Sequence, residues 1–134
     1  MDGATPWIDF ISTIDQDTTK RTTFLAGLQA TGAVTQITSL ATGVTLNAQS
    51  GVITTVSATT AAASTTSFVV TNSAVKSTSA IMLKVDNYAG TYFTNGMPIA
   101  QVSGIAAGSF TIVVINTHAT NALAGILKIG FAVN

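Results

Sequence analysis

From residue 44 to the C-terminus, apolar and polar residues alternate in short runs. In the first run, Val44, Leu46 and Ala48 alternate with Thr45 and Asn47. A period of two is expected for a β-strand that buries one face, because successive side chains point to opposite sides of a sheet. Six later runs predict strands in the same way: residues 52–57, 68–71, 81–85, 99–103, 110–115 and 126–133.

Short turn sequences separate these runs. Gln49-Ser50-Gly51 and Asn72-Ser73 are typical of turns. Asn95-Gly96 is a hairpin-type pair, and it follows Tyr92-Phe93, which we interpret as the start of a further short strand. Seven or eight short strands, with turns roughly every 8 to 14 residues, predict a mainly β domain over residues 43–134. The expected architecture is an antiparallel β-sandwich with jelly-roll-like connections.

Two of the runs, residues 110–115 and 127–133, are apolar on both faces. Such a strand is either central in its domain or covered by another subunit. From Leu46 to Val133 the polar positions are mostly Thr and Ser, and the charged residues are Lys76, Lys84, Asp86 and Lys128. A surface of hydroxyl and methyl groups indicates a module that packs against other proteins.

Residues 1–42 have a different composition and are predicted to form an N-terminal arm. Ser12 can cap a short helix, with Asp15 at the third following position and Gly32 as a stop. The pairs Thr18-Thr19 and Thr22-Thr23 disfavour that helix. The alternative is a partly extended arm that becomes ordered only against a neighbour, and the sequence leaves both open.

Charge and composition narrow the range of partners. The chain of 134 residues has zero formal net charge and 7% charged residues, far below the roughly 25% of typical soluble domains. Nucleic acid is not an expected partner, because phosphate binding needs clustered Lys and Arg. The absence of cysteine excludes disulfides and thiolate metal sites. Zero net charge favours contact between copies, and we expect a small oligomer, a homotrimer.

A membrane partner is not expected either. No apolar stretch approaches the roughly 18 residues of a membrane span, and the start of the chain lacks the pattern of a signal peptide. We expect a protein that is made in a cytoplasm and stays soluble until it meets its partners.

Few residues could support catalysis. His118 is the only histidine, and a Ser-His-Asp site would need it beside Ser109 and Asp86. No Gly-x-Ser-x-Gly nucleophile elbow is present, so we interpret His118 as a loop residue that bonds its own turn. One histidine cannot build a zinc site in a chain without Cys and Glu. We therefore expect no enzymatic activity and no cofactor.

Three other short sequence patterns lack the residues that their functional sites require. Asp15-Gln16-Asp17 resembles the start of a calcium loop, but the loop pattern requires other residues where this chain has Thr19 and Lys20. Ser73-Ala74-Val75-Lys76 matches a Ser-x-x-Lys string without its partner motifs. Asp86 stands alone in the β region, whereas a glycosidase needs paired carboxylates.

Tyr88, Tyr92 and Phe93 gather around a turn that contains glycine. Aromatic side chains in such a cluster can contact a glycan or a protein partner. The alternative is packing in the core or within a hairpin, which is the more frequent role of aromatic residues in a β domain.

The β region resembles a module that is common in structural proteins of tailed-bacteriophage virions, over about two-thirds of the chain. The segments that carry the resemblance are residues 46–55, 71–73, 85–90, 107–112, 116–118 and 122–129. The resemblance implies a non-enzymatic virion protein made in the host cytoplasm. A capsid decoration (cement) protein that binds the major capsid protein on the capsid surface is expected first. A tail or head fibre or spike module that binds a host glycan is the alternative.

The N-terminal arm is the expected attachment segment. It holds four large apolar residues in one short span, namely Trp7, Ile8, Phe10 and Ile11. Fully burying each of them is worth about 1.5–3 kcal/mol, and so short a segment cannot bury them by itself. They are therefore candidate partner-binding residues, which require a groove on this domain, on a sister copy or on the capsid protein.

Overall fold

The structure is a computed structural model and describes residues 31–134. This part of the chain contains eight β-strands. In chain order they are β1 (Thr31–Thr35), β2 (Val44–Thr45), β3 (Ser50–Ala58), β4 (Thr65–Thr71), β5 (Ile81–Tyr88), β6 (Pro98–Ala106), β7 (Ser109–Asn116) and β8 (Gly125–Val133). The predicted mainly β fold class is confirmed. Within the same range, no helix is long and apolar enough to span a membrane.

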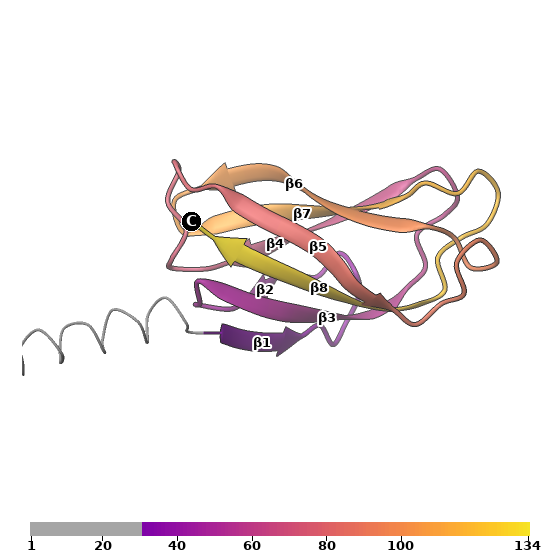
Figure 1. Cartoon of the computed structure of the whole chain (residues 1–134), viewed down its shortest axis with the longest axis horizontal. Helices are drawn as coiled ribbons and strands as arrows, with labels where there is room; N and C mark the ends of the chain where they lie inside the picture. Colours follow the sequence, from indigo (N-terminus) through magenta and orange to yellow (C-terminus); the bar gives the residue numbers. More distant parts are fainter. Residues whose placement is uncertain (1–30) are drawn as a thin grey trace, which may run out of the picture. The chain divides into compact units, whose positions relative to one another are not determined.

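The strands form two sheets of four (Figure 1). The order is β1-β3-β8-β5 in the first, called sheet A, and β2-β4-β7-β6 in the second, called sheet B. The edge strands β1 and β2 run parallel to β3 and β4, whereas the other pairs are antiparallel. The expectation of a wholly antiparallel fold was therefore wrong, because alternation shows which face of a strand is buried but not the direction of its neighbour.

The compact unit begins at Thr31, ahead of residue 43, where the hydrophobic pattern placed the start of the β domain. Strand β1 pairs with β3 from Thr31 to Thr35. Close approach of the two backbones depends on glycine: a Cβ on Gly51 would lie 2.8 Å from the Gly32 carbonyl oxygen and 2.8 Å from Cδ2 of Leu46. Part of the segment that we assigned to the arm is thus an edge strand of sheet A.

Side chains from both sheets form one hydrophobic core. Sheet A contributes Ile53, Leu127 and Ile129, all completely buried. The aromatic pair of Phe110 in β7 and Phe131 in β8 joins the sheets, with ring centroids 5.5 Å apart. Sheet B contributes the fully buried aliphatic side chains of Val70, Ile112 and Val114.

The connection between β5 and β6 differs from its prediction. Tyr92 and Phe93 do not form a strand; Phe93 makes only an isolated bridge to Gly96. Gly96 adopts a φ of 84°, a conformation that favours glycine. The tight turn therefore consists of Thr94 and Asn95, between the bridged Phe93 and Gly96, and it lies inside a loop instead of joining two strands.

Several sequence predictions lie outside the described residues. They include the possible helix, the aspartates of the failed calcium pattern and the four candidate attachment residues Trp7, Ile8, Phe10 and Ile11.

Candidate functional site

The outer faces of the two sheets differ in charge. Strands β2, β4, β6 and β7, which form sheet B, contain no charged residue. Sheet A carries Lys84 and Asp86 on β5 and Lys128 on β8, and Lys76 lies in the β4–β5 connection. Sheet B therefore presents a neutral surface, whereas sheet A combines charges with apolar positions.

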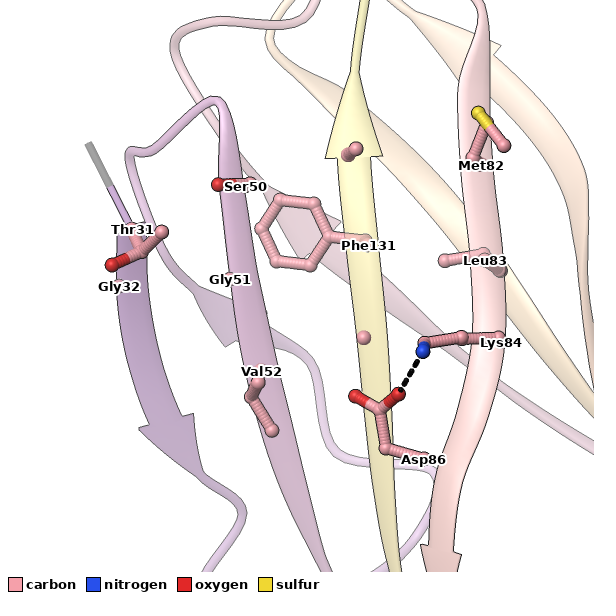
Figure 2. A pocket seen from close by; sticks show the side chains of 12 residues that line it. Thr31, Gly32, Ser50, Gly51, Val52, Met82, Leu83, Lys84, Asp86 and Phe131 are labelled. Atoms are coloured by element: carbon pink, nitrogen blue, oxygen red, sulfur yellow. Dashed lines mark ion pairs between the residues drawn. The ribbon is translucent and has the colours of Figure 1, made fainter. Parts of the chain in front are cut away.

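A groove of about 610 Å³ crosses the outer face of sheet A (Figure 2). Gly130 and Ala132 of the central strand β8 lie in it, between Val52 of β3 and Met82 of β5. Gly130 and Ala132 point outward because they alternate with the buried Ile129 and Phe131. Since both side chains are small, they leave a depression along the middle of the face. The complete lining consists of Thr31, Gly32, Ser50, Gly51, Val52, Met82, Leu83, Lys84, Asp86, Gly130, Phe131 and Ala132.

One ion pair lies along this groove. Lys84 Nζ is 3.1 Å from Asp86 Oδ1, and the two side chains are 79% and 29% exposed (Figure 2). A Cβ at position 130 would collide with the Asp86 carboxylate, so Gly130 makes room for it. An exposed pair of this kind contributes only about 0–1 kcal/mol to stability, and it offers a partner one polar contact beside an apolar surface.

The residues considered for metal binding and for a Ser-His-Asp site are not brought together in the described part of the chain. Across residues 31–134, no three His, Asp or Glu side chains are grouped to hold a metal ion. Ser109 begins β7 and His118 follows its end. A strand of eight residues places their backbones roughly 24 Å apart, so they cannot act together.

His118 bonds its own turn, as predicted. Its Nδ1 accepts hydrogen bonds from the backbone N–H groups of Thr120 (3.1 Å) and Asn121 (3.0 Å). With Nδ1 as the acceptor, the proton of the neutral imidazole belongs on Nε2. The residue therefore organises the β7–β8 loop, and its ring also lies edge-on to Phe93 with centroids 6.2 Å apart.

The predicted aromatic cluster separates into a buried and an exposed part. Tyr88 is buried; its hydroxyl donates to the Asn95 carbonyl and accepts from the Ala124 N–H. Tyr92 lies edge-on to Tyr88, with centroids 5.4 Å apart, and is 49% exposed, while Phe93 is 68% exposed. Tyr88 thus packs in the core, and of these three aromatic residues only Tyr92 and Phe93 are accessible to a ligand.

The residue that holds this end of the fold together, Asn116, was not predicted from the sequence. The Asn116 side chain donates through Nδ2 to the carbonyls of Thr60 (3.2 Å), Ala61 (3.2 Å) and Asn121 (2.8 Å). Its Oδ1 accepts from the N–H groups of Met97 and His118, both at 3.1 Å. Three loops therefore meet at one buried amide. The only sequence signal was an asparagine directly after an apolar run.

Comparison with known protein families, curated proteins and solved structures found no match.

Proposed function

We propose that this chain is a non-enzymatic structural protein of a bacteriophage virion, a decoration or cement protein that binds the capsid shell as a small oligomer, a trimer. The observation that carries the proposal is the surface chemistry. One of the two sheets has no charged residue in any of its strands, and the other presents an apolar groove with a single ion pair. Such surfaces suit permanent packing against protein neighbours.

We further propose that the two sheets form a sandwich related to the jelly roll. In support, the chain changes sheet between β3 and β4, β4 and β5, β5 and β6, and β7 and β8. Strand β8 lies between β3 and β5, and β7 lies between β4 and β6. Jelly rolls have this kind of two-sheet arrangement and recur in viral capsid proteins. The parallel edge strands β1 and β2 are additions to that pattern.

The direct test is to locate the chain in an electron-microscopy map of the virion that contains it. Density on the shell supports a decoration protein, and density at the tail supports a fibre or spike module. Absence from the particle contradicts both.

The first expected result concerns the proposed attachment segment. Trp7→Ala should leave the β domain folded but weaken attachment to the particle by roughly 2 kcal/mol or more, because Trp is the residue type most enriched in interface hot spots. Melting temperature and retention on purified particles are measured for the same variant. A variant that melts early yet remains bound whenever it is folded would show that Trp7 serves the core and not attachment.

The alternative function is a fibre or spike module that binds a host glycan. The exposure of Tyr92 and Phe93 favours it, because sugars stack on accessible aromatic rings, and the Asn121 side chain donates to the Phe93 carbonyl at 2.7 Å and so fixes this loop. Under the alternative, Phe93→Ala should abolish binding on a glycan array without changing the melting temperature. Absence of any glycan binding by the unmodified chain would remove this candidate.

A further inference from the structure

The outer face of sheet B is a regular, uncharged surface centred on β7. Thr111, Val113 and Ile115 point outward from β7, opposite the buried Phe110, Ile112 and Val114. Strand pairing extends this line into rows across β4, β7 and β6. The rows are Thr65–Ile115–Ile99, Ser67–Val113–Gln101, Val69–Thr111–Gly104 and Thr71–Ser109–Ala106.

Apolar side chains on this face are accessible. Val69 is 46% exposed and Ile99 is 43% exposed, and they stand near opposite corners of the face, in β4 and β6. Between them, Val113 and Ile115 are partly buried. The outward residues of this face are aliphatic or neutral polar ones, so another neutral face can cover it without burying a charge, which is the most costly kind of group to bury.

We propose that this face packs against the same face of a second copy of the chain. The charge distribution favours that partner. A charged partner would gain nothing here, since no ion pair can form, and would lose the hydration of its own charges. The outer face of sheet A, with Lys84, Asp86 and Lys128, is not a neutral complement. The identical face of another copy has the required chemistry. The inference rests on the proposed structural role. A contact between identical faces is two-fold symmetric, so it joins two copies, or two trimers, and is not the contact that closes a trimer.

The extent of the face sets the expected strength of the contact. Three strands of about seven residues cover roughly 24 Å by 14 Å, or about 350 Å². A stable pair of proteins usually buries about 800 Å² on each partner. The contact should therefore be weak for two isolated copies and depend on concentration, and it should become strong only where several contacts act together, as on a particle surface.

A matched pair of substitutions tests the assignment in the full-length chain. Val113 and Val52 are both partly buried, outward-facing valines on strands that have neighbours on both sides, one in each sheet. Sedimentation velocity over a concentration series should show at least tenfold weaker self-association for Val113→Lys. Val52→Lys should change it less than twofold. Should Val113→Lys fail to fold, Ser67→Lys introduces the same charge at an exposed position of the same row.

Mixing two variants of opposite charge tests whether the same face of each copy takes part in the contact. Val113→Lys and Val113→Glu should each be impaired alone, and an equimolar mixture should recover association, because opposite charges then meet across the contact. Equal effects of Val113→Lys and Val52→Lys, no recovery in the mixture, or a monomeric unmodified chain at every concentration would overturn the inference. Particle localisation separates the two proposals: a monomer that is nevertheless found on the shell leaves the structural role standing without this interface.

Discussion

Replacing Asn116 with aspartate is expected to destabilise the fold by about 4 kcal/mol or more. The Nδ2 group, which donates to the three carbonyls of Thr60, Ala61 and Asn121, would become an oxygen that faces them. The side chain is 1% exposed, so water cannot replace the lost bonds. A buried group left without a hydrogen-bond partner costs about 1–3 kcal/mol, and more if it is charged. Here several groups lose their partner together.

Urea unfolding measures this loss of stability. Its pH dependence shows whether the buried charge of the introduced carboxylate causes it. Burial and the neighbouring carbonyls should raise the pKa of the introduced carboxyl above the roughly 3.9 of an unfolded aspartate. The folded state then binds more protons than the unfolded state between these two pKa values, so the stability of Asn116→Asp should rise as the pH falls from 7 towards 4. Asn116→Ala should be destabilised by about 3–5 kcal/mol without this acid recovery.

The exposed Asn87 in β5 provides the matched control. Asn87→Asp should change the free energy of unfolding by no more than about 0.5 kcal/mol, as is usual for a surface substitution. Similar losses at positions 87 and 116, or a variant at position 116 as stable as the unmodified chain, would show that the amide does not join the loops.

Most of the strands could be predicted from the sequence, because a strand that buries one face alternates locally. The alternating run at residues 81–85 became part of β5, and the runs at residues 110–115 and 126–133, apolar on both faces, became β7 and β8. The strand partners could not be predicted in this way. Strand β1 pairs with residues far along the chain, and its five residues carry only one large apolar side chain, Val34. A local pattern this short is indistinguishable from a loop.

The character of the candidate surfaces was also only partly predictable. Both runs that are apolar on two faces were candidates for subunit contact, yet they behave differently. Strand β7 presents Val113 and Ile115 outward, whereas β8 presents Lys128 followed by the small residues Gly130 and Ala132. The groove of sheet A arises from the side-by-side placement of β3, β8 and β5. No segment of the sequence carries that signal alone.

Buried asparagines were misjudged for a related reason. Asn72 was interpreted as a turn residue, which agrees with its position directly after β4, and Asn116, at the end of β7, was assigned no structural role. Asn72 is completely buried, however, and donates to the Ala48 carbonyl at 2.7 Å while it accepts from the Ala74 N–H at 2.9 Å. An amide can satisfy backbone groups of several loops only after the tertiary fold has brought them together.

Truncating Phe110 to alanine is expected to lower the free energy of unfolding by about 3–5 kcal/mol, as for other large-to-small changes in a core. Phe110 is 1% exposed, and its ring in sheet B contacts that of Phe131 in sheet A. The change therefore removes packing between the sheets. Phe93→Ala makes the same chemical change at an exposed loop position and should alter stability by no more than about 0.5 kcal/mol. Urea unfolding of both variants, with equal m-values, measures the difference. A loss at Phe110 no larger than that at Phe93 would contradict a core shared by the two sheets.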